Sequence, residues 1–112
     1  IMEGIQRASK YVLRKSIEYS PGSVVSKVIT KMDSGNITLF AFDREQELSE
    51  HTAPFDAMVQ VLEGNALITI AGEEFEMREG EFIVMPANVP HAVFARDRFK
   101  MMLVMIRGGA PS

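Results

Sequence analysis

The chain has 112 residues, of which 46% are hydrophobic, and its net charge is −3. This length predicts one domain with one core, and the acidic balance excludes the basic surface that nucleic-acid binding needs. The absence of cysteine excludes disulfides and thiolate chemistry and agrees with a cytoplasmic location. No apolar run reaches the roughly 18 residues of a membrane-spanning helix, so no membrane partner is expected.

The N-terminal segment, residues 1–20, is predicted to form a short helix or an arm, and a turn follows at 20–23. Beyond it, glycine and proline recur at short intervals between apolar or β-branched runs. This spacing is typical of an all-β barrel or sandwich. The chain is therefore predicted to be a single domain over 1–112, with its barrel over about 24–107.

Eight strands are expected in this barrel. They cover 24–31, 37–42, 58–62, 66–70, 74–77, 81–85, 91–95 and 101–106. The polar stretch 43–50 is interpreted as a solvated loop. Gly64, Gly72 and Gly80 separate the central strands and supply positive φ angles there. The last strand is apolar without alternation, which predicts that both of its faces are covered.

The only two histidines of the chain stand at related places. His51 precedes the strand at 58–62, which ends at Gly64. His91 follows Gly80, a short apolar strand and a Pro-Ala-Asn turn, and it opens the next strand. A small β-barrel would point both side chains into its mouth. We therefore expect His51 and His91 to face one cavity and to share one ligand or water network.

The segment before His91 resembles the second sequence motif of the cupin superfamily, G-x5-P-x-G-x2-H-x3-N. Gly80, Pro86 and His91 match this motif in register. Asn88 replaces its second glycine, which is tolerable because asparagine adopts positive φ more readily than most residues. Ala95 replaces the final asparagine. The resemblance implies an all-β fold, a small jelly-roll barrel with a short N-terminal arm or helix.

The first cupin motif, G-x5-H-x-H-x3,4-E-x6-G, is matched in part. His51 and Gly64 are in register with it. Ala53 stands in the place of the second histidine, Ala57 in that of the glutamate, and Glu45 in that of the opening glycine. The two motifs together cover about half of the chain.

The resemblance implies a divalent metal, Fe, Mn, Ni, Cu or Zn, held by three histidines and a glutamate. Only His51 and His91 carry over as metal ligands, and two imidazoles are too few for a tight site. Asp56 is a candidate third ligand, although neighbouring strand residues face opposite ways unless a bulge intervenes. Weak metal retention is therefore expected. In a metal-free role, Asp56 or Glu50 would orient His51 for proton exchange.

The chain is rich in methionine and phenylalanine. These side chains are interpreted either as core filling or as an adaptable lining for an apolar ligand. We expect a pocket around the two histidines that also includes Phe55, Met58, Gln60 and Met85.

Three functions remain open. The first is a small-molecule-binding cupin. The second is an enzyme, either a metal-dependent oxygenase or isomerase with a reduced ligand set, or a metal-free isomerase that uses histidine acid–base chemistry. The third is an effector-binding half of a sensor whose DNA-binding part lies elsewhere. A homodimer is expected, with the N-terminal segment as the exchanged or augmenting strand.

Overall fold

The computed structural model describes residues 5–107, and almost all of its regular structure is β-strand. The elements, in chain order, are the 3-10 helix η1 (Leu13–Lys15) and the strands β1 (Val24–Met32), β2 (Gly35–Phe42), β3 (Glu47–His51), β4 (Ala57–Glu63), β5 (Ala66–Ile70), β6 (Glu73–Met77), β7 (Phe82–Met85), β8 (His91–Phe94) and β9 (Phe99–Ile106). No helix within this range is long and apolar enough to cross a membrane.

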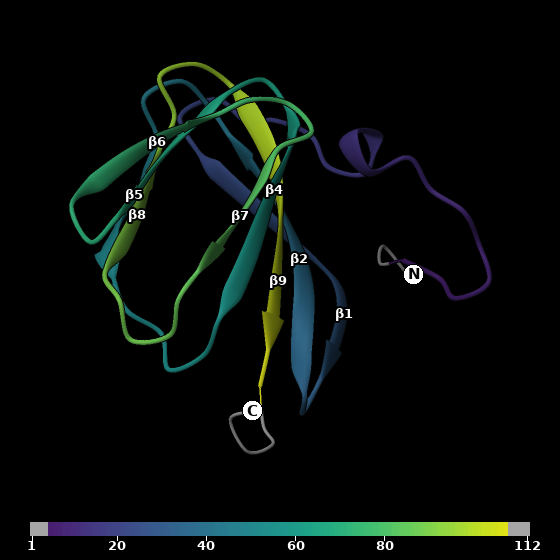
Figure 1. Cartoon of the computed structure of the whole chain (residues 1–112). Coiled ribbons are helices and arrows are strands. Elements are labelled where there is room, and N and C mark those ends of the chain that lie inside the picture. Colours follow the sequence, from purple (N-terminus) through teal and green to yellow (C-terminus); the bar gives the residue numbers. More distant parts are fainter. Residues whose placement is uncertain (1–4, 108–112) are drawn as a thin grey trace.

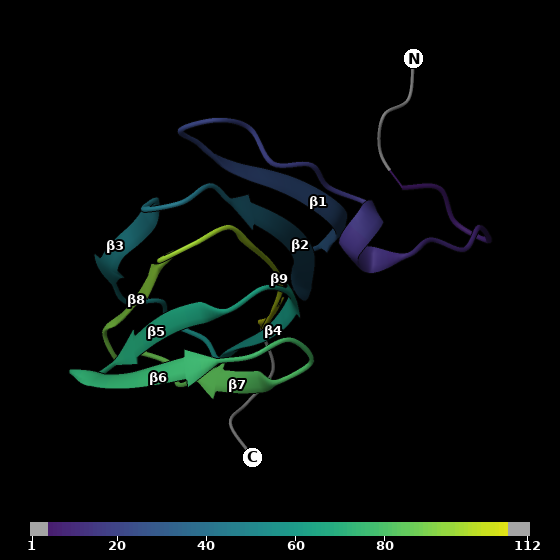
Figure 2. The same ribbon diagram turned by 90° about the horizontal axis from the view of Figure 1, so that it is seen from above.

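The strands form two antiparallel sheets. The five-stranded sheet has the order β1-β2-β9-β4-β7, and the four-stranded sheet has the order β3-β8-β5-β6. Figures 1 and 2 show the two sheets facing each other, with crossovers that carry the chain repeatedly from one to the other. This is the predicted jelly-roll barrel, and the fold prediction is confirmed.

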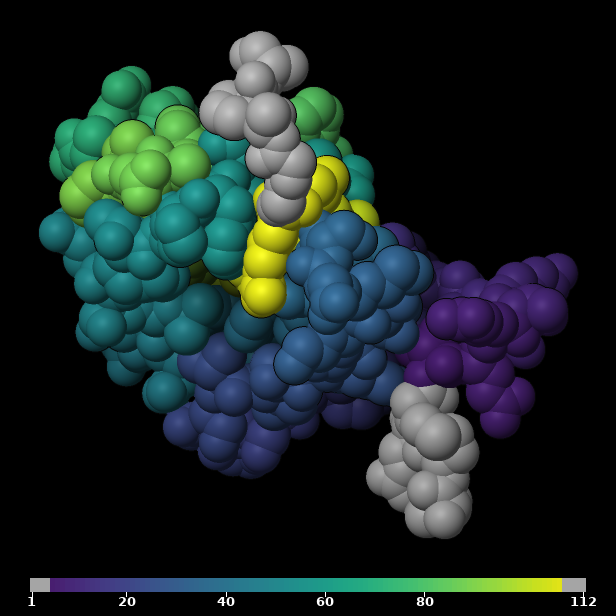
Figure 3. All heavy atoms as spheres, turned by 90° about the horizontal axis from the view of Figure 1, so that it is seen from below, coloured from purple at the N-terminus to yellow at the C-terminus, as the bar shows by residue number. Residues whose placement is uncertain are grey.

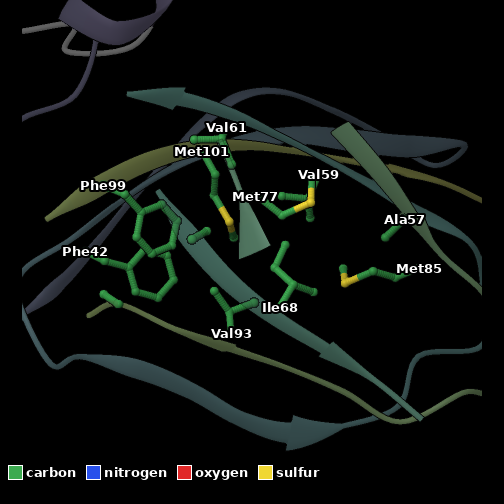
Figure 4. Close-up of a cluster of buried hydrophobic side chains, with 12 residues drawn as sticks. Phe42, Ala57, Val59, Val61, Ile68, Met77, Met85, Val93, Phe99 and Met101 are labelled. Atoms are coloured by element: carbon green, nitrogen blue, oxygen red, sulfur yellow. The ribbon is translucent and has the colours of Figure 1, made fainter. Parts of the chain in front are cut away.

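The space between the sheets is filled by alternate residues of each strand. Phe42 and Phe99 stack on each other within it, with ring centroids 4.5 Å apart and planes at 11°. Val59, Ile68 and Val93 pack around them, each almost fully buried. Figure 4 shows these side chains converging from both sheets. The interior is therefore a packed core rather than an open channel.

Strand β3 was not expected, because its sequence was interpreted as a solvated loop. It pairs with β8 at the edge of the four-stranded sheet. Leu48 packs against the core, whereas Glu47, Ser49, Glu50 and His51 are exposed. Charged side chains on an edge strand discourage pairing with other chains, so a strand of this kind has a loop-like composition.

The N-terminal segment packs against the outer face of the five-stranded sheet. Ile17 is only 4% exposed and forms a second apolar cluster with Leu39 and Ala41. Tyr19 and Met102 pack against that cluster. Of the helix or arm expected here, the described residues 5–20 form an arm with the single helical turn η1.

Polar contacts fix the same segment in place. The buried Lys100 ammonium donates to the carbonyl oxygen of Arg14 at 2.5 Å. The hydroxyl of Tyr19 donates to Oε2 of Glu63 at 2.6 Å. Burial and the Glu63 carboxylate raise the pKa of Tyr19, so the phenol keeps its proton. Residues 14–19 are thereby tied to β4 and β9.

Strand β9 is covered on both faces only over its first part. Phe99, Lys100 and Met101 are buried, but exposure increases along the strand and Ile106 is 70% exposed. Within the single chain, the predicted cover is therefore present over the first part of the strand and not at its C-terminal end. The docked N-terminal segment reaches Met102 but does not extend further along this face.

Candidate functional site

Four strand ends meet at one end of the barrel, which we call the mouth. β3 ends at His51, β4 begins at Ala57, β7 ends at Met85 and β8 begins at His91. β3 pairs antiparallel with β8, and β4 with β7, so these ends are adjacent in each sheet. His51 and His91, together with the ligand positions now occupied by Ala53 and Ala57, are therefore brought to the same end of the barrel.

Two loops at the mouth hold each other through hydrogen bonds. The N–H of Asn88 donates to the carbonyl oxygen of Ala53 at 2.7 Å, and the N–H of Ala87 donates to Oδ1 of Asp56 at 2.8 Å. Asn88 has a φ of 62°, the positive value expected where the motif has glycine. Asp56 is thus used to join the loops. Contact between it and His51, one of the sequence-based alternatives, is not present.

The register of β3 and β8 places the two histidines opposite each other. His91 shares the inner face of β8 with Val93 and is only 5% exposed. It lies opposite His51 on β3, after an irregularity between Leu48 and His51. His51 is more exposed and lies at the rim. One imidazole is therefore deep and the other faces solvent.

The two imidazoles meet through their Nε2 atoms, which are 3.1 Å apart. Their ring centroids are 4.3 Å apart and their planes are at 69°. The opposite nitrogens face backbone carbonyls: Nδ1 of His51 is 2.8 Å from the Ser49 oxygen, and Nδ1 of His91 is 3.2 Å from the Val89 oxygen. Each ring is thus held at one nitrogen and presents the other to its neighbour.

A proton count shows what this arrangement needs. A carbonyl oxygen only accepts, so a hydrogen bond at each Nδ1 requires a proton on that nitrogen. Two neutral imidazoles have two N–H protons in all, and both are used in this way. The contact between the two Nε2 atoms then has two lone pairs and no proton. It calls for a third proton, a ligand donor or a cation between or beside the two nitrogens.

His91 retains an additional proton poorly at neutral pH. Burial lowers the pKa of His91, and proximity to His51 lowers it further, although the hydrogen bond to the Val89 carbonyl opposes both effects. Neutral imidazole is therefore the favoured form of His91 above its ordinary pKa of 6.5. The unprotonated Nε2 atom of His91 is then a hydrogen-bond acceptor that faces the Nε2 atom of His51.

The other predicted pocket residues are placed differently. Met85 is buried in the core opposite Ala57. Met58 and Gln60 alternate with the buried Ala57 and lie on the outer face of the sheet, where Gln60 donates to the Gly80 carbonyl oxygen at 3.3 Å. Their assignment to the pocket is corrected accordingly. Phe55 is half-buried beneath the Arg107 guanidinium, whose carbon is 5.3 Å from the ring centroid.

A full metal site does not fit the residues at the mouth. Two Nε2 atoms 3.1 Å apart match neighbouring ligands of one ion, because metal–imidazole bonds are about 2.1 Å long. Ala53 and Ala57 supply no further donor. Among residues 5–107, no group of three or more His, Cys, Asp or Glu side chains is placed to hold an ion. Two protein ligands make at most a weak site.

Two clefts lie away from the histidines. One, of about 410 Å³, is near the β4–β5 turn and is lined by residues including Arg78, Arg96 and Asp97. The other, of about 830 Å³, lies between the N-terminal segment and β1, with Tyr11 and Lys27 among its lining residues. Neither includes His51 or His91. The histidine pair therefore lies outside both clefts, at the rim of the barrel and next to the packed core.

Comparison with known proteins relates the chain to one family. A family model described as a cupin domain matches residues 38–107. No curated protein is similar enough in sequence to match. A conserved protein of unknown function from Streptococcus pyogenes is 36% identical, with a TM-score of 0.89 over 96% of this chain and 94% of its own. A cupin superfamily protein from Desulfitobacterium hafniense is 25% identical, with a TM-score of 0.87 over 94% of this chain and 96% of its own.

A more distant structure has a known activity. Salicylate 1,2-dioxygenase from Pseudoaminobacter salicylatoxidans is 18% identical and has a TM-score of 0.70. The alignment covers 80% of this chain but 26% of the dioxygenase. At this identity the likeness shows a shared fold and no more.

Proposed function

The chain belongs to the cupin superfamily, and on that premise we propose that it binds a small molecule at the mouth through the pair His51–His91. The observation that carries this proposal is the convergence of two Nε2 atoms, 3.1 Å apart, with both Nδ1 atoms held by backbone carbonyls. Two acceptors at one point select a ligand group that donates hydrogen bonds, such as a hydroxyl.

The surroundings of the pair indicate the rest of the ligand. His91 lies above the apolar core, next to inward-facing Val93, whereas His51 is open to solvent. A ligand held by its hydroxyl therefore has an apolar body of modest size, because the filled core leaves no deep cavity. Phenol has this combination of a donor and an apolar body, and it is a suitable probe.

Imidazole nitrogen NMR tests the proposal, since the chain contains only two histidines and each ring can be followed. We expect phenol to shift the Nε2 resonances of both rings together. Anisole, in which a methyl group replaces the donated proton, should leave them unchanged at the same concentration. The His91→Gln variant should lose the response of His51 to phenol. Equal responses to phenol and anisole, or no response to either up to about 10 mM, would contradict the proposal.

A second candidate is a cupin enzyme, and two observations favour it. The Nε2 separation suits two neighbouring ligands of a divalent ion, as in an oxygenase or isomerase with a reduced ligand set. Alternatively, the lowered pKa of His91 leaves it neutral and able to accept a proton from a bound substrate, as in a metal-free isomerase. No observation favours the role of a sensor half.

Zinc binding distinguishes a metal-dependent enzyme from a metal-free isomerase and from a small-molecule-binding protein. We expect Zn²⁺ to bind the wild-type protein weakly and to be lost on dialysis against a chelator. Ala53→His combined with Ala57→Glu should raise the affinity, because it adds the donors that the motif lacks. Stoichiometric zinc after dialysis of the wild type would favour the metalloenzyme. Equal affinities in the two proteins would mean that residues 53 and 57 do not reach the ion.

A further inference from the structure

We infer that the cleft near the β4–β5 turn is a second binding site, and that its ligand is a small organic carboxylate. The cleft has a volume of about 410 Å³ and is lined by the turn, by residues of β5 and β6 and by the β8–β9 connection. This volume is within the range of roughly 300–1,000 Å³ that is usual for small-molecule pockets. The inference depends on residues outside the mouth and is independent of the ligand proposed there.

The cleft lies at the end of the barrel opposite the mouth. β8 begins at His91 in the mouth and runs to Phe94, and the β8–β9 connection follows it. β5 is antiparallel to β8, so its first residues, which line the cleft, lie at the far end. Figure 1 shows the β8–β9 connection and the β7–β8 loop at opposite ends of the barrel. The described part of the N-terminal arm does not cover the cleft, because Figures 2 and 3 show it leaving the barrel beside β1, away from β5 and β6.

The apolar part of the lining comes from β5 and β6. Ala66 and Met77 lie opposite each other in these strands, and both are buried. Leu67 follows Ala66 on the outer face of β5, where it is half-buried opposite Phe94 of β8. These side chains offer contact to the apolar body of an organic ligand.

Three arginines supply the basic part of the lining, and two of them have carboxylate partners. Arg96 forms an ion pair with Glu76. Nε of Arg98 donates to Oδ1 of Asp43 at 2.8 Å, and its guanidinium lies over the Tyr19 ring, 5.1 Å from the centroid. That bond uses only Nε, so the two Nη atoms of Arg98 remain as donors in a guanidinium whose orientation is fixed.

The third arginine, Arg78, directly follows β6 and is exposed. Within residues 5–107 its guanidinium forms no ion pair, whereas two nearby carboxylates are engaged elsewhere. Oδ2 of Asp97 is 3.6 Å from Nη2 of Arg44, and Oε1 of Glu81 accepts the backbone N–H of Arg78 at 2.8 Å. A guanidinium presents a fork of N–H donors that matches the two oxygens of a carboxylate. Arg78 is therefore placed to bind the carboxylate of a ligand.

The charge of the lining selects the class of ligand. Three arginines and the two carboxylates of Glu76 and Asp97 leave one positive charge in excess, on a chain whose net charge is −3. Such a local excess of positive charge attracts an anion. A carboxylate has a single negative charge, which one unpaired guanidinium balances. A phosphate group has a charge of about −1.5 to −2 at pH 7 and would place surplus negative charge beside the two carboxylates.

Titration of the full chain with benzoate, followed by proton–nitrogen NMR of the backbone amides, tests this inference. The titration is made at constant ionic strength and about pH 7, where a carboxylate is ionised. We expect saturable shifts at residues 64–67, 76–78 and 96–98, with a Kd on the order of 1 mM. Benzamide, which has the same shape without the charge, should leave these amides unchanged. Inorganic phosphate, which has no apolar body, should bind at least fivefold more weakly than benzoate.

Two variants locate the site. Arg78→Gln should weaken benzoate binding at least fivefold, because it removes the guanidinium that has no ion pair. Arg7→Gln is the matched control, since it removes the same charge from an exposed position of the N-terminal arm, and it should bind benzoate like the wild type. The imidazole resonances of His51 and His91 report on the mouth, and benzoate should leave them unchanged.

Equal responses to benzoate and benzamide, equal affinities for benzoate and phosphate, or wild-type affinity in Arg78→Gln would each overturn the inference. Equal weakening in Arg78→Gln and Arg7→Gln would also overturn it, since the effect would then follow the net charge and not the cleft. Benzoate shifts confined to the mouth would have the same consequence. None of these results bears on the binding of phenol by the two histidines, so the two proposals can fail separately.

Discussion

Gly64 closes the turn between β4 and β5, and Gly64→Ala tests how closely that turn is packed. Its φ is 76°, and a Cβ added there would lie 2.5 Å from the carbonyl oxygen of Arg98 and 3.1 Å from Cβ of Phe99. The left-handed backbone costs alanine about 1–2 kcal/mol, and displacing fixed neighbours costs roughly 1–3 kcal/mol more. We therefore expect the free energy of unfolding to fall by about 2–5 kcal/mol.

Gly72→Ala is the matched control. Gly72 has a similar φ of 82°, but an added Cβ would meet no atom within 4 Å. Only the conformational cost of about 1–2 kcal/mol then applies. Urea denaturation followed by circular dichroism, at one protein concentration for all variants, measures both losses. Equal losses in the two variants would refute the close approach of Gly64 to the β8–β9 connection.

Three further predictions concern single side chains. Glu45 stands in the place of the motif's opening glycine and has a φ of 65°. Glu45→Gly should therefore raise the free energy of unfolding by about 0.5–1 kcal/mol in the same urea assay. A lower free energy of unfolding would contradict this prediction. Because the pKa of His91 is lowered, the unfolded chain binds its proton more tightly than the folded chain. The wild type should therefore lose stability as the pH falls below about 6.5, and more steeply than His91→Gln. Urea titrations at several pH values measure this, and parallel plots of unfolding free energy against pH for the two proteins would refute it. Tyr19→Phe removes the hydroxyl donated to Glu63 and should cost about 1 kcal/mol in urea; an unchanged midpoint would argue against this contact.

The fold could be predicted because its signals are local. Positive φ at Gly64, Gly72 and Gly80 follows from residue type, and it also holds at Asn88. Strand β3 was missed because an edge strand with only one core residue, Leu48, has the composition of a loop.

The proximity of His51 and His91 could be predicted from motif register. The hydrogen-bond partner of each imidazole nitrogen could not. The carbonyls of Ser49 and Val89 hold both Nδ1 atoms, and a backbone oxygen leaves no sequence signal. Gln60 was expected in the pocket, but it alternates with the buried Ala57 along β4 and faces away from it. The docking of the N-terminal segment depends on Lys100, a distant lysine that no local pattern connects to Arg14.

The tautomers of the two histidines in the free protein test the central claim most directly. Long-range proton–nitrogen NMR of the two imidazoles at about pH 8 distinguishes Nδ1–H from Nε2–H rings. We predict that both rings carry their proton on Nδ1, next to the carbonyls of Ser49 and Val89, and that both Nε2 atoms are unprotonated. An Nε2–H tautomer on either ring would contradict the account, because the two nitrogens would then not form one accepting site.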